Sequence, residues 1–393
     1  MPLAVYILGV AIFAQGTSEL MLAGLLPELS ADLGVSVPDA GLLISGFAIG
    51  MLVGGPALAV LTLRWPPRTA LLSFMAAFAA MHVVGGLTSS YEVLLATRVA
   101  GAFVYAGFWA VAAVTAINLV PAGARGRALS VVVGGLTMAI LIGLPAGTLM
   151  GQSLSWRATF WAVAALSALA AAGVLATVPN TRPQGEEPSV RAEVRALARP
   201  QVWLAVATTA VSTAALIVVF TYLGALVVDT TGLAPVWVAG VLALYGLGSL
   251  IGVTLGGRVA DARPFALLFA GLSGVTLVSA GIALGAAAAW AVVPLAFLLG
   301  AFGFAANPAL NARVFTLAAG APTLAASVNV SAFNLGITAG PWLGGLALEA
   351  GLGYPSIGWI GAVLGLAALA LVALARRAAE PVVQPVEPVV RAS

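Results

Sequence analysis

The sequence predicts an all-α membrane protein in which twelve transmembrane helices form two related halves of six. Three observations support this fold class. The chain has 393 residues, of which 62% are hydrophobic and only 7% are charged, whereas soluble domains carry about 25% charged residues. Twelve apolar runs are long enough to cross a bilayer, and short motifs of the first half recur in the second. Lipid is therefore the expected solvent for most of the chain.

The twelve runs follow one another with short polar breaks between them. A helix needs about 20 apolar residues to cross about 30 Å of hydrocarbon, and it must satisfy its own backbone polar groups there. We expect the spans at 3–26, 40–62, 69–88, 92–119, 126–151, 157–177, 201–228, 235–257, 264–287, 289–316, 323–348 and 354–375. The breaks are rich in Pro, Gly and charge, as in RWPPR and DARP. The first run lacks a positive leading segment and a clear cleavage site, so we expect it to remain as the first span.

The arginines predict the orientation of the chain, because basic residues favour the cytoplasmic side of short loops. All sixteen basic residues are Arg. If the chain begins in the cytoplasm, fourteen of them fall on the cytoplasmic side: Arg64, Arg68, Arg125, Arg127, Arg182, Arg191, Arg195, Arg199, Arg258, Arg263, Arg313, Arg376, Arg377 and Arg391. The opposite loops hold several acidic residues and only one basic residue, Arg157. We therefore predict that both termini are cytoplasmic.

The longest polar stretch divides the spans six and six. It predicts an N-terminal bundle over 1–178, a cytoplasmic linker over 179–200, a C-terminal bundle over 201–376 and a cytoplasmic tail over 377–393. FAIGMLVG at 47–54 aligns with YGLGSLIG at 245–252 at an offset of 198 residues, and GLPAG at 143–147 has a counterpart in GITAGPWLGG at 336–345. Internal repeats around a central linker are typical of secondary transporters, although Gly-rich apolar helices also match one another by chance.

These features resemble the major facilitator superfamily over essentially the whole chain. The resemblance implies two six-helix bundles around a central cavity. The pattern G-x-x-x-G-P-x-x-G-G marks drug:proton antiporters of the superfamily when it lies in span five. Here it is complete in span eleven, through Gly336, Gly340, Pro341, Gly344 and Gly345. We expect these residues to allow close helix approach and bending during conformational change; the alternative is simple packing of small residues.

The loop signature of the superfamily is also better kept in the second half. The loop after span two, LRWPPR, lacks the usual Asp, whereas GGRVADARP after span eight keeps Asp261 between Arg258 and Arg263. Two interpretations of Asp261 and Arg258 stay open. They either brace the cytoplasmic ends of helices or belong to a solvated loop.

The opening stretch narrows the resemblance. GTSELMLAGLLPELSADLGVSVPDAGLL, the Trp-Pro pair at 65–66 and WRATFWAV at 156–163 are similar to the chloramphenicol exporters of actinomycetes. Bacterial sugar and nucleoside effluxers share a similar T-S-E stretch. The resemblance therefore implies efflux of amphenicol drugs, with a sugar, nucleoside or other metabolite as the alternative cargo.

Glu19 and Arg98 are charged residues inside predicted spans. An ionised side chain at a helix centre costs at least about 2.5–3.5 kcal/mol, and a carboxyl reduces that cost by taking up a proton. At 1.5 Å per residue, both residues lie roughly 10 Å below the outer boundary. We predict that Glu19 carries the coupled proton and that Arg98 balances its charge. The alternatives are a neutral structural Glu bonded to neighbouring backbone or to Thr17 and Ser18, and an Arg that snorkels to the interface.

The chain has one His and no Cys, which excludes thiolate metal sites and makes a zinc site unexpected. His82 lies at similar depth on span three, which is usually peripheral in the fold that the resemblance implies. A packed or interfacial histidine is therefore favoured over a proton relay. No H-E-x-x-H motif, Cys–His pair or carboxylate cluster is present, so we expect no enzyme, no catalytic residue and no cofactor.

Aromatic residues and neutral amides on the expected cavity helices predict the cargo. They suit an uncharged or weakly charged aromatic molecule with hydroxyl or amide groups, although each aromatic residue taken singly also fits helix packing. The candidates are Phe13, Gln15, Tyr105, Phe108, Trp109, Thr221, Tyr222, Tyr245, Asn307, Asn311, Asn329, Phe333 and Asn334.

The combined prediction is a monomeric, proton-coupled exporter of chloramphenicol-type drugs in a bacterial cell membrane. Its partners would be the small-molecule drug, protons and the lipid bilayer, with no nucleic acid. Besides a different cargo, there are two rivals of another class. The missing motifs argue against a membrane-embedded enzyme, and the symmetric halves and the buried Glu19 argue against a sensor that transports nothing.

Overall fold

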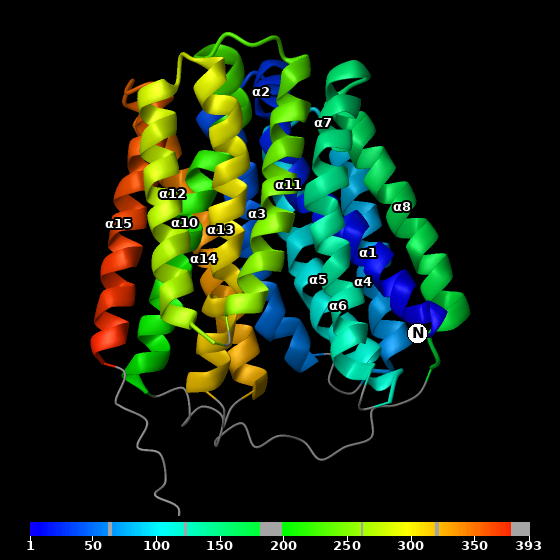
Figure 1. Cartoon of the computed structure of the whole chain (residues 1–393). Helices are drawn as coiled ribbons and strands as arrows, with labels where there is room; N and C mark the ends of the chain where they lie inside the picture. Colours follow the sequence, from blue (N-terminus) through cyan, green and yellow to red (C-terminus); the bar gives the residue numbers. More distant parts are fainter. Residues whose placement is uncertain (62–64, 122–123, 181–198, 261, 319–321, 379–393) are drawn as a thin grey trace, which may run out of the picture.

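The computed structural model describes residues 1–61, 65–121, 124–180, 199–260, 262–318 and 322–378, which form helices and short connections (Figure 1). For residues 56, 59–60, 125–126, 129–130 and 322–327 it describes the backbone alone. Within this part of the chain, all regular structure is helical. This agrees with the predicted all-α class.

The first half of the chain supplies six helical spans, two of which are interrupted by a short turn of another helix type. Its elements are α1 (Leu3–Leu20), η1 (Met21–Gly24), α2 (Leu26–Leu33), α3 (Val37–Leu61), α4 (Pro67–Leu87), α5 (Tyr91–Asn118), α6 (Arg125–Met138), η3 (Ala139–Gly143), α7 (Leu144–Ser153) and α8 (Trp156–Thr177). The second half supplies α10 (Pro200–Asp229), α11 (Val236–Val259), α12 (Pro264–Gly285), α13 (Ala289–Leu317), α14 (Pro322–Glu349) and α15 (Pro355–Arg377).

These elements coincide with the predicted spans, with one difference in number. Among the described residues, eleven helical segments are long and apolar enough to cross a membrane. The remaining predicted span, 323–348, corresponds to α14, a helix of 28 residues whose first turns are described by backbone alone. Every predicted span therefore has its helix. The long helices run side by side (Figure 1).

Span one, observed over Leu3–Gly24, agrees with the prediction to within two residues but is not one continuous α-helix. The expected helix over 3–26 ends at Leu20 and continues as the single 3₁₀ turn η1 before α2 begins. Pro27 has no N–H to donate to the carbonyl of residue 23, so a straight helix could not continue through this point. At Gly34, φ is +66°, and this left-handed residue ends α2. In span five a similar interruption, the π-helical η3, precedes Pro145.

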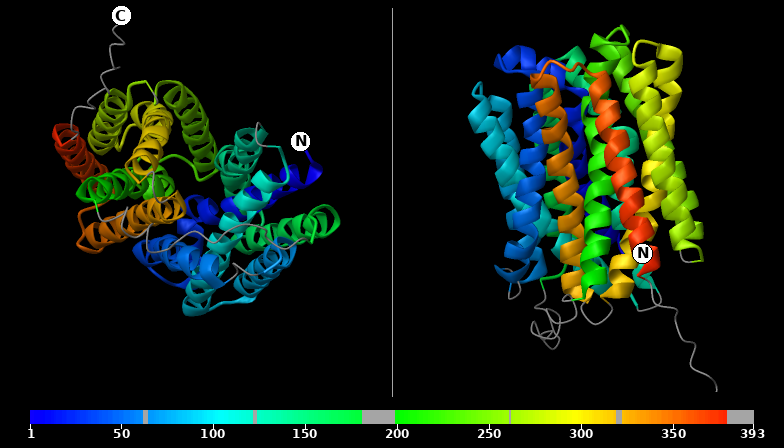
Figure 2. Two further views of the ribbon diagram at one scale, coloured as in Figure 1. Left: turned by 90° about the horizontal axis from the view of Figure 1, so that it is seen from below. Right: turned by 90° about the vertical axis from the view of Figure 1, so that its left-hand side faces the viewer.

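The two halves form two groups of helices. In the view from below, the blue-to-cyan helices and the yellow-to-red helices lie on opposite sides (Figure 2). In the first half α3 packs on α5 and α4 on α8, while in the second α11 packs on α13 and α12 on α15. Between the halves, α14 packs on α3, and α11 packs on η3 and α7. The exact domain limits stay a prediction, because most of the expected linker lies outside the described residues.

The repeated glycines pack in the same way in both halves. A Cβ on Gly50 of α3 would lie 2.2 Å from the carbonyl oxygen of Val99 on α5. One on Gly248 of α11 would lie 2.1 Å from the carbonyl oxygen of Phe297 on α13. The glycine one turn later repeats each contact, Gly54 with Phe103 at 2.3 Å and Gly252 with Ala301 at 2.0 Å. The predicted offset of 198 residues thus relates the glycines and also the residues that they face.

The glycine pattern in α14 serves close packing against α10. A Cβ on Gly336 would lie 2.4 Å from the carbonyl oxygen of Ala210, and one on Gly340 would lie 3.0 Å from that of Ala214. Gly344 and Gly345 face the ring and the hydroxyl of Tyr222. Small residues at these positions let the two helix backbones approach. Their expected role in conformational change stays a prediction.

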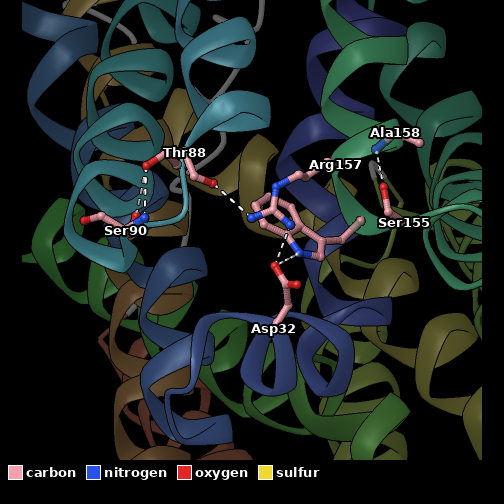
Figure 3. A network of polar contacts seen from close by, with 7 residues as sticks. Asp32, Thr88, Ser90, Ser155, Arg157 and Ala158 are labelled. Carbon is pink, nitrogen blue, oxygen red and sulfur yellow. Dashed lines mark hydrogen bonds and ion pairs between the residues drawn. The ribbon is translucent and has the colours of Figure 1, made fainter.

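The short helix α2 is tied to the first half by polar contacts (Figure 3). Asp32 accepts hydrogen bonds from Trp156 Nε1 at 2.9 Å and from Arg157 Nη1 at 2.5 Å, and Arg157 also donates to the carbonyl of Thr88 at 3.1 Å. The hydrogen bonds from Trp156 and Arg157 lower the pKa of Asp32. This network joins α2 to α8 and to the end of α4. We call this end of the molecule, at the top of Figure 1, the α2 end.

Candidate functional site

Three buried polar side chains meet where α1, α4 and α5 come together. Arg98 Nη1 donates to Ser18 Oγ at 2.8 Å, and Ser18 Oγ lies 2.5 Å from His82 Nε2. His82 Nδ1 lies 2.8 Å from the carbonyl oxygen of Phe78. The exposed fractions are 2% for Arg98, 0% for Ser18 and 3% for His82. The guanidinium is therefore enclosed by the helices, which excludes the alternative of an Arg that reaches out to an interface.

Glu19 follows Ser18 and lies near Arg98 without pairing with it. The two residues interact electrostatically, but in the described part of the chain the ion pair within 4.0 Å is the one between Asp32 and Arg157. Instead, the Arg98 guanidinium lies over the Phe47 ring, 4.2 Å from its centroid. Its Nε and Nη2 atoms are buried without a hydrogen-bond partner. These free donors leave Arg98 able to form further polar contacts.

Glu19 lines a cavity at the boundary between the two halves. The lining residues from the first half are Glu19, Leu20, Ala23, Ile44 and Phe47, and those from the second half are Ile217, Phe220 and Ile337. Glu19 is the titratable group of this apolar lining. The hydroxyls of Thr17 and Ser18 bond to the Phe13 carbonyl and to His82 respectively, so neither is described as a partner of the carboxylate.

Two predicted aromatic residues lie behind the cavity lining. Tyr105 packs on Phe47 with ring centroids 6.0 Å apart, and its hydroxyl accepts a hydrogen bond from Trp109 Nε1 at 3.1 Å. Tyr245 stacks on Phe220 at 4.6 Å and 26°. Sequence reasoning named this second layer and missed Phe47 and Phe220 themselves. The signal available for Phe47 was its place at the start of the repeated FAIGMLVG motif.

Other predicted ligands from the first half are buried or partly buried around the same helices. Gln15 is 0% exposed, and neither of its amide atoms has a partner. Phe13 is half-buried on the same helix. Phe108 is 0% exposed within the hydrophobic core. Thus Gln15 has unused hydrogen-bonding capacity, whereas Phe108 is a packing residue in this structure.

Tyr222 has a partner within its own half. Its hydroxyl donates to the carbonyl of Pro341 at 2.8 Å, at the proline inside α14. A Cβ on Gly41 of α3 would lie 2.6 Å from this hydroxyl. Tyr222 therefore sits at the contact between the halves, toward the α2 end. Its neighbour Thr221 is 0% exposed, and its hydroxyl is without a partner.

The predicted asparagines form a separate group between α13 and α14. Asn329 Nδ2 donates to Asn311 Oδ1 at 2.5 Å, and Asn311 Nδ2 donates to the carbonyl of Asn307 at 2.8 Å. Asn334 donates to the Val330 carbonyl of its own helix. Phe333 packs on a small core cluster of the second half. None of these side chains belongs to the cavity lining around Glu19.

The proposed brace at the other end of the molecule is described only in part. Arg258 is exposed in the last turn of α11. Asp261 lies outside the described residues, so the choice between a brace and a solvated loop stays a prediction. In the part of the chain that the structure covers, no group of three His, Asp or Glu side chains could hold a metal ion.

The chain has extensive similarity to known proteins. Residues 8–329 match the family described as the Major Facilitator Superfamily. A chloramphenicol resistance protein of Streptomyces lividans is 47% identical over 346 residues, which cover 87% of this chain and 88% of that protein. The inner membrane transport protein YdhP of Escherichia coli K12 is 34% identical over 94% of this chain and 95% of that one. A crystal structure of a mutant of the peptide transporter POT in complex with sulfate superposes with a TM-score of 0.77 at 13% identity, covering 96% of both chains.

Proposed function

Because the chain belongs to the major facilitator superfamily, and is thus a multi-pass transporter of the bacterial cell membrane, we propose that it exports chloramphenicol-type drugs in exchange for protons. The observation that carries this proposal is Glu19, a carboxyl group on an otherwise apolar cavity between the halves, close to the buried Arg98. The 47% identity to a chloramphenicol resistance protein supports the choice of cargo.

Glu19 is suited to carry the proton because two opposing effects act on it. Loss of water favours the neutral carboxyl, and the positive charge of Arg98 favours the ionised form. A modest change in either effect, as the cavity opens to one side and then the other, would load or release the proton. In this scheme Glu19 releases its proton to the cytoplasm when the drug binds from that side. Glu19 takes up another proton when the cavity faces the outside of the cell. The halves would rock about the cavity.

The lining of the cavity supports a neutral aromatic cargo. Phe47 and Phe220 face it from opposite halves, and Tyr105 and Tyr245 support them from behind. Such a surface suits an aromatic ring, while Glu19 and the free donors of Arg98 suit hydroxyl or amide groups. We propose that Phe47 and Phe220 contact the drug, and that the predicted Tyr105, Trp109 and Tyr245 shape the site around them.

The exchange of one proton for a neutral drug moves charge across the membrane. Moving one elementary charge across the membrane is worth about 2.3 kcal/mol per 100 mV of membrane potential. A potential of about 100 mV therefore supports a drug gradient of roughly fifty-fold. The arginine distribution supports an orientation with both termini in the cytoplasm, and hence with the α2 end facing outward.

The proposal is tested by uptake into proteoliposomes that contain the purified protein. Labelled chloramphenicol should accumulate when a pH gradient is imposed and should leak away when an ionophore collapses it. Liposomes without protein give the background. A labelled sugar and a labelled nucleoside, offered in the same preparation, test the alternative cargoes. If one of them accumulates while chloramphenicol does not, the cargo is wrong; if no solute responds to the pH gradient, proton exchange is wrong.

A further inference from the structure

We propose that His82 is a positioning residue for Arg98, and that it acts through Ser18. In this arrangement His82 accepts the Ser18 hydroxyl hydrogen, so that the Ser18 oxygen is turned toward the guanidinium and holds it back from Glu19. The inference deepens the proposed proton exchange and rests on it, but the hydrogen-bond arrangement can be tested without any transport. It gives a role to the one histidine of the chain.

The directions of the three hydrogen bonds follow from the chemistry of their atoms. Arg98 Nη1 can only donate, so Ser18 Oγ accepts at 2.8 Å. The remaining contact of Ser18 is His82 Nε2 at 2.5 Å, which takes the hydroxyl hydrogen if this nitrogen carries none. The ring then bears its hydrogen on Nδ1, which donates to the Phe78 carbonyl, a group that can only accept, at 2.8 Å. For a neutral ring, one arrangement of hydrogens therefore satisfies all three contacts: the ring hydrogen on Nδ1 and the Ser18 hydroxyl hydrogen directed at Nε2.

The surroundings of His82 favour this neutral ring. Phe78 and Phe160 pack against the ring, with ring centroids at 4.2 and 5.5 Å. The charged group acting on it from α5 is Arg98, and α1 contributes Ser18, which is followed by Glu19. A second positive charge on the ring would face Arg98 in a dry environment, which is unfavourable. His82 thus serves as a fixed acceptor and does not itself carry the exchanged proton.

The chain of hydrogen bonds from His82 through Ser18 to Arg98 explains why Arg98 and Glu19 are near one another without forming an ion pair. Once released from Ser18, the guanidinium would be free to approach the carboxylate and favour its ionised form. Proton uptake by Glu19 would then require a lower external pH. A residue on α4, away from the cavity lining, would in this way set the working pH of the transporter.

The first test is nitrogen-15 NMR of the full-length protein in lipid nanodiscs after labelling of histidine. Because the chain has one histidine, a single ring gives the signals. We expect a neutral ring with its hydrogen on Nδ1 across the pH range in which transport occurs. Ser18→Ala should move the Nε2 resonance. The matched control is Ser167→Ala, which removes another fully buried hydroxyl of the same half that has no partner. A hydrogen on Nε2, a charged ring, or an Nε2 resonance indifferent to Ser18→Ala would overturn the proposal.

The second test separates positioning from packing by the order of two variants. His82→Gln keeps an acceptor and loses the aromatic ring, whereas His82→Phe keeps the ring and loses the acceptor. If His82 positions Arg98, the His82→Gln variant should retain more transport than the His82→Phe variant. If His82 only fills space, His82→Phe should retain more transport, and the proposal is wrong.

The pH profile of transport completes the test. Ser18→Ala should move the profile about one pH unit toward acid and lower kcat/KM about tenfold at the original optimum, since a hydrogen bond to a charged group is lost. Ser18→Thr should restore both, and Ser167→Ala should change neither. If the pH profile of transport were unchanged in Ser18→Ala, the hydrogen bond from Arg98 to Ser18 would have no part in the mechanism. Failure of the wild-type protein to respond to a pH gradient would instead reject the proposed function and leave the NMR test standing.

Discussion

The two halves of the molecule share their helix packing and differ in their charge. At the offset of 198 residues, the glycines of α3 and α11 meet equivalent carbonyl oxygens on α5 and α13. The same offset pairs Arg98 with Ala296, Ser18 with Leu216, Glu19 with Ile217 and His82 with Ala280. Backbone contacts have therefore been kept in both copies, whereas the polar cluster exists in one.

Under the proposed mechanism, this difference gives each half its own role. Burying ionisable groups among apolar helices is costly, and one carboxyl group is sufficient for exchange of one proton. The second half instead faces the cavity with Ile217, Phe220 and Ile337. In the proposed mechanism the first half handles the proton, and the second supplies an apolar wall for the drug.

The largest expected effect comes from removing the acid that distinguishes the halves. Glu19→Gln should abolish drug movement driven by a pH gradient, because an amide cannot exchange a proton in this range. Uptake into proteoliposomes measures this. Glu349→Gln makes the same chemical change at an exposed position at the end of α14, and it should transport normally. Retained coupling in Glu19→Gln would remove Glu19 from the mechanism.

The next effect concerns the cation of the same cluster. Arg98→Ala should shift the pH optimum of transport upward by about one unit or more, because the ionised form of Glu19 loses its positive neighbour. This shift is opposite in direction to the one expected for Ser18→Ala. Arg377→Ala, at an exposed position at the end of α15, is the control for loss of one positive charge. If the profile of Arg98→Ala matched the wild type, the two residues would not be coupled.

A smaller effect tests the feature that the halves share. Gly50→Ala and Gly248→Ala should destabilise the protein by similar amounts, about 1–3 kcal/mol, because each new Cβ would overlap a carbonyl oxygen. Thermal unfolding in detergent measures both. Gly240→Ala in α11 is the matched control, since its Cβ would meet nothing within 4 Å. A large loss in one half alone would break the structural equivalence.

The smallest effect concerns the ion pair between Asp32 of α2 and Arg157 of α8. Asp32→Asn should cost up to about 1 kcal/mol at pH 7, as expected for a partly exposed ion pair. The pKa of Asp32 is lowered in the folded protein, so its contribution is complete above the unfolded value of about 3.9 and is lost as the pH falls through the folded value. The difference in unfolding temperature between variant and wild type should therefore shrink below about pH 4. A difference that stayed constant with pH would show that the carboxylate charge is not involved.

Hydropathy and motif spacing predicted the helices well, because each span must bury its own backbone groups in lipid. They also placed Glu19 and Arg98 at one depth, and the structure brings Ser18 and Arg98 into contact. The 3₁₀ turn after Leu20 was missed; at Gly24 it lies against Thr148 of another helix, a contact that the sequence of one span does not indicate. The facing of Phe47 and Phe220 and the contact of His82 with Ser18 were missed for the same reason. Such contacts depend on how helices rotate against one another, which local sequence does not specify.

One hydrogen bond between the halves offers a practical handle. Gln152 Nε2 donates to the Pro235 carbonyl at 3.0 Å and so bridges the seam at the α2 end. Since the native chain contains no cysteine, a thiol introduced on each side of this seam would have no competitor. A reversible disulfide there would hold the two halves together at the α2 end until a reductant cleaved it. In the proposed rocking motion the halves must separate at this contact once in every cycle, so the disulfide would switch transport off and its reduction would switch transport on.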